Sequence, residues 1–168
     1  LDRLNIGDTI HSFGMSAGRK RQPGSYVGII AYGVGITEAL PVAQAELRKG
    51  DADTVKLLWA SRTVDDTFWN DEIKNLQKQY PKKFQLVQIF SREQQEQCQN
   101  MDNNSNDMTT VLHGRINPGI LSQVFQPPDK ANARFLSVGT KAMMYETDDM
   151  LSSIGFSMPQ HGLIPKQK

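Results

Sequence analysis

The chain has 168 residues, enough for one domain with a well-formed hydrophobic core. Its formal net charge is only +1 and its lysine and arginine residues are scattered, so it has no basic block of the kind that binds nucleic acid. No apolar stretch approaches the roughly 20 residues that a membrane-spanning helix needs, and we therefore expect neither a nucleic-acid partner nor a membrane segment in this chain.

The first 25 residues differ from the remainder of the chain. Residues 1–22 read as a short strand pair or an extended arm, followed by a basic, glycine-rich connection. The sequence starts at Leu1 in the middle of this pattern, and we expect it to be part of a longer protein. We therefore divide the chain into residues 1–25 and a domain of residues 26–168.

From residue 26 onward, short apolar runs alternate with segments of helical spacing. The apolar runs of strand length are residues 26–31, 55–60, 84–90 and 135–138. The predicted helices start at the capping residue Thr37, at Asp65 or Asp66, at Pro118 and at Lys141, and end before Gly50, at Pro81, at Phe125 and at Ile154. Residues 93–110 are rich in glutamine, asparagine and aspartate and read as a long exposed loop.

The predicted strands are apolar throughout rather than at every second residue. Strands of this composition are buried on both faces, and here they alternate with helices. The sequence therefore predicts an α/β fold, with a parallel sheet that has helices on both faces in a Rossmann-like three-layer arrangement. Such sheets bind ligands at the carboxyl ends of their strands, so the residues directly after each strand are the candidate site.

A glycine-containing turn follows the first predicted strand. Its five residues are Gly33, Val34, Gly35, Ile36 and Thr37. Glycine allows a tight bend and the close approach of a ligand, and the helix that follows would direct N–H groups and its positive dipole end at an anion. The motif is incomplete, because Glu38 takes the place of a third glycine. Taken alone, the turn is as consistent with a plain strand-to-helix connection as with phosphate binding.

Small or polar residues follow the other three strands as well. Arg62 follows the second strand, where an ordinary dinucleotide fold would place an acidic residue for the ribose hydroxyls. Ser91 and Arg92 follow the third strand, and a hydroxyl beside a guanidinium can hold a phosphate. Gly139 and Thr140 follow the fourth strand and begin a helix. Each has a plain alternative, which for Arg62 is an ion pair within its own loop, but together they favour a phosphate-bearing ligand that lies across the sheet.

The order of these motifs resembles the ferredoxin-NADP reductase superfamily, in particular the branch of cytochrome b5 reductase and nitrate reductase. The family's nucleotide-binding domain begins with a Gly-Gly-x-Gly-Ile-x-Pro turn, which residues 31–37 resemble. Residues 57–66, LLWASRTVDD, are similar to the family's second strand, LLYANRTEDD. The segments YPKKFQLV (80–87) and HGRI (113–116) follow in the family's order. Residues 138–143 then resemble its Cys-Gly-x-x-x-Met motif.

The resemblance implies an NAD(P)H-dependent, FAD-containing reductase that passes hydride from the nucleotide to FAD and electrons to an acceptor such as a cytochrome or another haem protein. Residues 1–25 resemble the last edge of the family's flavin-binding barrel and its linker. The FAD would therefore be held by an upstream flavin-binding domain of the same protein, which is the expected partner. This chain alone is expected to be inactive, and no catalytic residue is assigned.

The resemblance also implies roles for the candidate site residues. The turn of residues 33–37 would cradle the pyrophosphate and the nicotinamide side of the nucleotide, and Arg62 would lie near the phosphates or the ribose. Gly139, Thr140 and Met143 would border the nicotinamide and adenine pockets.

The choice between NADH and NADPH depends on the end of the third strand. Ser91 stands where NADH-using members of the family often carry aspartate. A hydroxyl followed by Arg92 would repel a 2′-phosphate less and could bind it, so the resemblance makes NADPH a candidate beside NADH.

The sequence departs from the family pattern where the nucleotide would lie. Ala31 and Tyr32 stand for the first glycines of the turn, Glu38 for its proline, and Val138 for the family's cysteine. These departures favour an alternative in which the chain is a degenerate reductase-like domain that acts as a scaffold or interaction module without catalysis. A third interpretation is a general nucleotide-binding α/β domain unrelated to electron transfer.

Cysteine and histidine point to no further site. Cys98 is the only cysteine, which excludes an internal disulfide and favours an intracellular, reducing compartment, either the cytoplasm or an organelle. We interpret it as a loop thiol. The three histidines, His11, His113 and His161, are too dispersed for a recognisable metal motif, and we expect no metal site.

Overall fold

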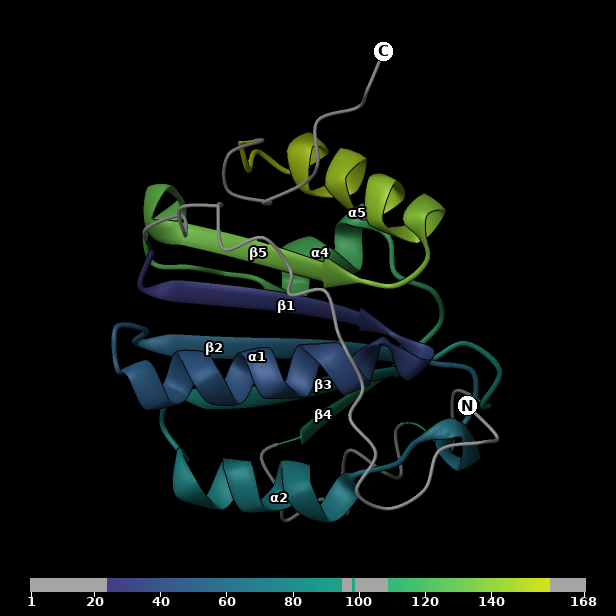
Figure 1. Ribbon diagram of the computed structural model, residues 1–168. Helices are drawn as coiled ribbons and strands as arrows, with labels where there is room; N and C mark the ends of the chain where they lie inside the picture. Colours follow the sequence, from purple (N-terminus) through teal and green to yellow (C-terminus); the bar gives the residue numbers. More distant parts are fainter. Residues whose placement is uncertain (1–23, 95–97, 99–108, 158–168) are drawn as a thin grey trace, which may run out of the picture.

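Five parallel strands form one sheet in the computed structural model, which describes residues 24–94, 98 and 109–157. Along the chain, the strands are β1 (Tyr26–Tyr32), β2 (Thr54–Ser61), β3 (Phe84–Phe90), β4 (Thr109–His113) and β5 (Ala133–Val138). In space their order is β4-β3-β2-β1-β5, and all four neighbouring pairs run parallel (Figure 1). The predicted parallel sheet is thereby confirmed.

Helices cover both faces of this sheet. The α-helices are α1 (Ile36–Lys49), α2 (Asn70–Gln79), α4 (Pro118–Val124) and α5 (Lys141–Ser153), and 3₁₀ turns lie at Gly33–Gly35, Val64–Asp66 and Lys130–Asn132. Apolar residues of α1 and α2 form one hydrophobic cluster with one face of the sheet, and those of α4 and α5 form a second cluster with the other face. The predicted three layers are therefore present.

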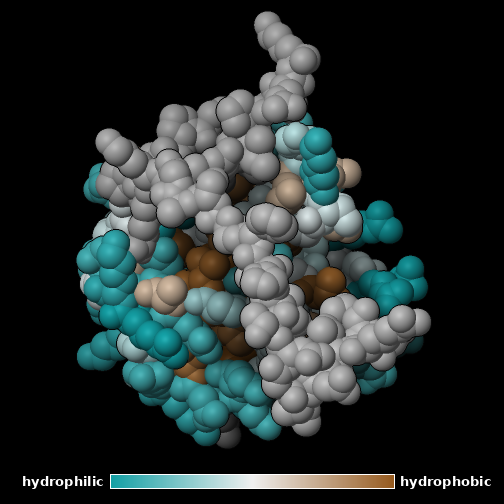
Figure 2. Space-filling view, viewed as in Figure 1, coloured by the Kyte–Doolittle hydropathy of each residue, from teal (hydrophilic) through white to brown (hydrophobic). Residues whose placement is uncertain are grey.

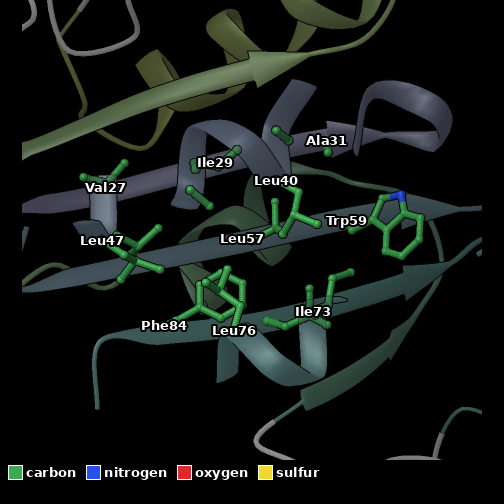
Figure 3. Close-up of a cluster of buried hydrophobic side chains, with 14 of the residues drawn as sticks. Val27, Ile29, Ala31, Leu40, Leu47, Leu57, Trp59, Ile73, Leu76 and Phe84 are labelled. Atoms are coloured by element: carbon green, nitrogen blue, oxygen red, sulfur yellow. The ribbon is translucent and has the colours of Figure 1, made fainter. Parts of the chain in front are cut away.

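Successive residues of the central strands alternate between these two clusters. Ile29 of β1 and Leu57 of β2 belong to the cluster under α1 and α2, whereas Ile30 and Leu58 belong to the cluster under α4 and α5. All four side chains are fully buried. Figure 3 shows the first cluster, where side chains from three strands and two helices meet. Burying a side chain of this size stabilises a fold by about 1.5–3 kcal/mol, which explains why the strands are apolar on both faces.

The outer surface of α2 is hydrophilic. All of its exposed residues are polar, among them Asp71, Lys74 and Lys78, and hydrophilic side chains dominate the lower left of the surface in Figure 2. A helix both long enough and apolar enough to cross a membrane does not occur among the residues that the structure describes.

The first helix begins before Thr37, which the sequence predicted as its capping residue. The 3₁₀ turn over Gly33–Gly35 leads directly into α1, and Gly35 lies at the N-cap. The hydroxyl of Thr37 donates a hydrogen bond to the carbonyl of Val34 (2.9 Å), so it caps no backbone N–H group. The prediction was wrong because the 3₁₀ turn already starts the helical backbone at residue 33.

The second helix begins later than predicted, at Asn70 rather than at Asp65 or Asp66. The residues before it form a separate 3₁₀ turn, in which the carboxylate of Asp66 accepts hydrogen bonds from the backbone N–H (3.3 Å) and the hydroxyl (3.1 Å) of Thr63. Trp69 then adopts left-handed backbone angles (φ 59°) directly before α2.

The strand β4 was not predicted. It begins at the end of the polar segment 93–110, and its residues are partly buried or exposed because it lies at the edge of the sheet. Cys98 within that segment is buried rather than exposed. The other residues of 95–108 lie outside the described part of the chain, as do residues 1–23 of the predicted first domain.

Candidate functional site

The carboxyl ends of the strands lie at one edge of the sheet, because all of the strands run parallel. β1 lies between β2 and β5, and the order of the strands along the chain reverses there. The helix after β1 lies over one face, whereas the helices around β5 lie over the other (Figure 1). Open α/β sheets bind their ligands at such a point.

The structure brings the predicted site residues together at this edge. Beyond the end of β2, the backbone N–H of Arg92 donates a hydrogen bond to the carbonyl of Arg62 (2.8 Å), so the turns after β2 and β3 stay in register. On the other side of β1, Ala31 pairs with Val138. The turns after β1 and β5 therefore start side by side.

The turn after β1 needs its two glycines for different structural reasons. Gly33 has positive φ (52°), and a Cβ atom there would meet nothing within 4 Å. Gly35 has φ −58°, but a Cβ atom at this position would lie 2.6 Å from the carbonyl oxygen of Val138. Gly33 therefore provides the left-handed turn on the open side, whereas Gly35 allows the turn to pack against the end of β5.

The helical turn after β1 begins with backbone N–H groups that can bind a ligand. The N–H groups of Gly33 and Val34 come first and have no acceptor within the 3₁₀ turn. They coincide with the positive end of the α1 dipole, so an anion such as a phosphate can accept hydrogen bonds here. Glu38 is exposed in the first turn of α1 and would oppose a bound anion at the same position.

The indole of Trp59 contacts this turn from β2. Its Nε1–H donates a hydrogen bond to the carbonyl of Gly33 (2.9 Å), and Figure 3 shows the nitrogen directed toward the turn that follows β1. The ring is fully buried and meets Phe68 edge-on at 5.8 Å, and Phe68 in turn meets Trp69 at 5.7 Å. Sequence reasoning missed this residue, because an aromatic side chain within an apolar strand is indistinguishable from core.

Tyr32 links the end of β1 to α5 on the opposite face. Its hydroxyl bonds to Oγ1 of Thr147 (2.6 Å), and Thr147 donates onward to the carbonyl of Met143 (2.8 Å). The ring also lies against Gly139, where a Cβ atom would be 3.0 Å from a ring carbon. Burial raises the pKa of Tyr32, and the hydrogen bond to Thr147 partly offsets this effect.

Arg62 forms an ion pair within its own loop, as the plain alternative predicted. Its Nε and Nη2 donate to the two carboxylate oxygens of Asp66 at 3.1 and 2.9 Å. The hydrogen bond with Arg62 holds the pKa of Asp66 below its ordinary value. Because the pair is exposed, solvent and salt weaken it.

Arg92 is exposed at the end of β3, beside the half-buried Ser91. The next residue, Glu93, accepts a hydrogen bond from the backbone N–H of Val64 (2.8 Å), which holds this loop against the turn after β2. In the part of the chain that the structure describes, the guanidinium of Arg92 has no hydrogen-bond or ion-pair partner, so it can accept an anionic ligand.

A second helix begins at the same edge. Oγ1 of Thr140 accepts a hydrogen bond from the backbone N–H of Met143 (3.4 Å) and so caps α5 directly after β5. The side chain of Met143 is 40% exposed and that of Val34 is 75% exposed, so each of the two turns carries an exposed apolar side chain. Figure 1 shows that α1 and α5 both begin at this end of the sheet, after β1 and β5.

Among the residues that the structure describes, the other reactive side chains form no second site. Burial raises the pKa of the Cys98 thiol, which makes it a poor nucleophile. His113 is exposed at the end of β4, whereas His11 and His161 lie outside the described residues. Within residues 24–94, 98 and 109–157, no three histidine, cysteine or acidic side chains come together as a possible metal site.

Known protein sequences are similar to most of this chain. A family model described as "Oxidoreductase NAD-binding domain" matches residues 29–149. NADH–cytochrome b5 reductase 1 of Arabidopsis thaliana is 32% identical over 92 residues, which cover 53% of this chain and 33% of that protein. A component of the 1,2-phenylacetyl-CoA epoxidase of Escherichia coli (strain K12) is 28% identical over 149 residues, which cover 85% of this chain and 37% of that component. The chain thus spans little more than a third of the length of these relatives.

Solved structures share the fold. The cytochrome b5 reductase domain of Ulva prolifera nitrate reductase superposes with a TM-score of 0.62 at 18% identity, covering 80% of this chain and 46% of that one. A ferredoxin NADP+ reductase from Neisseria gonorrhoeae, solved with bound FAD and NADP, gives a TM-score of 0.60 at 22% identity, covering 85% of this chain and 54% of that one.

Proposed function

The chain belongs to the oxidoreductase NAD-binding domain family within the ferredoxin-NADP reductase superfamily, and from this we propose that it is the nicotinamide-nucleotide-binding module of a flavoprotein oxidoreductase. In the whole protein, hydride would pass from NAD(P)H to FAD in an upstream flavin-binding domain, and electrons would pass on to an acceptor such as a cytochrome. The observation that carries the proposal is that helices α1 and α5 both begin directly after neighbouring strands, β1 and β5, at the switch point of the sheet.

The residues at this edge fit a dinucleotide. The space beside Gly33 is open, the first N–H groups of the turn have no acceptor within the helix, and the start of α5 adds a second positive dipole end. The bulk of Tyr32 does not oppose this fit, because the hydrogen bond to Thr147 turns its ring toward α5.

A bound nicotinamide supplies the hydride, and the residues of this chain bind and orient the nucleotide. We assign the pyrophosphate to the turn of residues 33–37, whose first N–H groups have no acceptor within the turn, and the neighbourhood of the phosphates or the ribose to Arg62. Gly139, Thr140 and Met143 border the nicotinamide and adenine pockets in this proposal. The contribution of the chain is positional, since it holds the nucleotide at an edge that a flavin-binding domain can face.

The experiment that tests this proposal is a calorimetric titration of the 168-residue chain with NADPH and with NADH. We expect binding of both nucleotides, with NADPH the tighter, because the exposed guanidinium of Arg92 beside Ser91 can hold a 2′-phosphate. Arg92→Ala should narrow the difference by roughly 1–3 kcal/mol, the scale of a charge-assisted hydrogen bond. The matched control is Arg48→Ala, which removes an exposed arginine from the opposite end of α1 and should leave both affinities unchanged. If the parent chain binds NADPH and NADH with equal affinity and Arg92→Ala changes neither affinity, Arg92 does not bind the 2′-phosphate.

A scaffold or interaction role without catalysis is the second candidate. It is favoured by the apolar side chain of Val34, which is 75% exposed at the centre of the edge, and by Val138 in the place of the family's cysteine. The same titration decides between the two candidates. If the folded chain binds neither nucleotide at millimolar concentration, the scaffold function replaces the nucleotide-binding one.

A further inference from the structure

The carbonyl of Gly33 is held by two donors at once. The buried indole N–H of Trp59 donates to it at 2.9 Å, and the backbone N–H of Ile36 donates to it from the helical turn. Gly33 itself has left-handed backbone angles, and no side chain of its own fixes the orientation of its peptide group. The indole is therefore the side chain that restrains this peptide group from outside the turn.

Restraining this carbonyl also restrains the N–H group on the far side of the same peptide bond. The peptide bond is planar and trans, so the carbonyl of Gly33 and the N–H of Val34 point in opposite directions. With the carbonyl directed inward at Trp59, the N–H of Val34 is directed away from the core, at the edge where the helical turn begins. It is also one of the N–H groups that have no acceptor within the helix.

We propose that Trp59 is a positioning residue for nucleotide binding, which aims the N–H of Val34 at the pyrophosphate by holding the carbonyl of Gly33. This inference rests on the proposed function. The strand of the resembling family, LLYANRTEDD, carries tyrosine where this chain has Trp59, so an indole N–H donor at this position distinguishes this sequence from that pattern.

Trp59 also contributes to the core, so loss of stability alone does not reveal a positioning role. Phe keeps an aromatic ring at this position but removes the N–H donor. Trp69 offers a matched control, because it is the other tryptophan of the chain, is 39% exposed, and contacts Phe68 rather than the turn. The variants to compare are Trp59→Phe and Trp69→Phe in the 168-residue chain.

The first measurement is calorimetric titration with NADPH and NADH. The loss of one neutral hydrogen bond that orients a donor should weaken binding roughly threefold to tenfold in Trp59→Phe and leave Trp69→Phe unchanged. The second measurement is fluorescence of Trp69→Phe, in which Trp59 is the remaining tryptophan. Its emission should change on saturation with NADP+, which unlike NADPH does not absorb at the wavelength of tryptophan emission, and the measurement requires no substitution at Trp59.

The third measurement is amide hydrogen exchange over residues 33–37 without nucleotide. It should be faster in Trp59→Phe than in Trp69→Phe, because the turn loses its restraint. If the parent chain binds neither nucleotide, the proposed function fails, while exchange still decides whether Trp59 holds the turn. Equal exchange in the two variants would overturn the positioning role, as would nucleotide binding that is equal in both variants together with an unresponsive Trp59 emission.

Discussion

Gly35 is the residue of the turn after β1 at which a side chain is most directly excluded. The obstacle is the backbone oxygen of Val138, which cannot move away as a flexible side chain could. Gly35→Asn should therefore lower the free energy of unfolding by about 1–3 kcal/mol, the usual cost of overpacking. Gly33→Asn should cost less than about 1 kcal/mol, because asparagine tolerates left-handed backbone angles and the space there is open. Chemical denaturation of both variants measures the difference, and equal losses would contradict it.

Tyr26 makes the stability of the fold sensitive to alkaline pH. Burial raises the pKa of Tyr26 from its ordinary value of 10.0 to about 12. Between these two pH values the unfolded chain releases a proton that the folded chain retains, so stability falls as the pH rises. We expect the fall between pH 10 and pH 12 to be shallower in Tyr26→Phe than in the parent, as measured by urea denaturation. Identical pH profiles for the two proteins would refute this assignment.

Residues of the candidate site were predictable where they follow strands, but their partners were not. Apolar runs that alternate with helices reveal where the strands end. The positions of Gly33, Arg62 and Gly139 follow from these strand ends. That Trp59 supports Gly33, or that the ring of Tyr32 lies against Gly139, depends on contacts between elements far apart in the sequence. No local pattern encodes such contacts.

At the scale of elements, an ion pair joins α1 to β5. Glu46 of α1 and Arg134 of β5 form two hydrogen bonds, one of them between Oε1 and Nη1 at 3.0 Å, and their side chains are 10% and 12% exposed. Glu46→Gln removes the carboxylate that pairs directly with the largely buried guanidinium of Arg134 and leaves it the electrostatic attraction of Asp51, so the free energy of unfolding should fall by about 3 kcal/mol. The exposed pair of Lys49 and Asp51 provides the control, since Lys49→Gln should cost less than about 1 kcal/mol. Denaturation curves in which both variants lose the same amount would rule out a special role for the buried pair.

Element types were easier to predict than the places where elements begin. The third strand was predicted at its observed bounds, Phe84–Phe90, because it is a continuous apolar run between polar segments. The start of α2 was missed because Asp66 accepts two hydrogen bonds within its own 3₁₀ turn, and acidic residues that form such turns resemble helix starts. β4 was missed because an edge strand is only half-buried and follows a polar segment.

At the scale of the whole molecule, this chain corresponds to about a third of the length of its curated relatives. We predict that the purified 168-residue chain carries no flavin and has no NADPH-dependent dye-reductase activity. The physical reason is that the resemblance assigns to it only the last edge of a flavin-binding barrel, and an isoalloxazine pocket needs the rest. The absorbance spectrum between 350 and 500 nm measures bound flavin. A yellow preparation with FAD at near-stoichiometric occupancy would contradict the division of the chain into residues 1–25 and 26–168.

The place of β5 beside β1 has a consequence for the order of folding. The side chain of Arg134 in β5 donates a hydrogen bond to the carbonyl of Gly24, which is 110 residues away in the sequence. The elements from β1 to β3 can associate earlier, through contacts between residues that are closer in the sequence. Closing a long loop costs entropy and slows folding, so β5 is expected to dock last. During synthesis, one edge of β1 would stay open until residue 138 has left the ribosome. Gly35 gains its contact with β5 in that step, and Tyr32 gains its contacts with Gly139 and Thr147 once α5 has followed. A nascent chain would therefore become able to bind its ligand only after the sheet is complete.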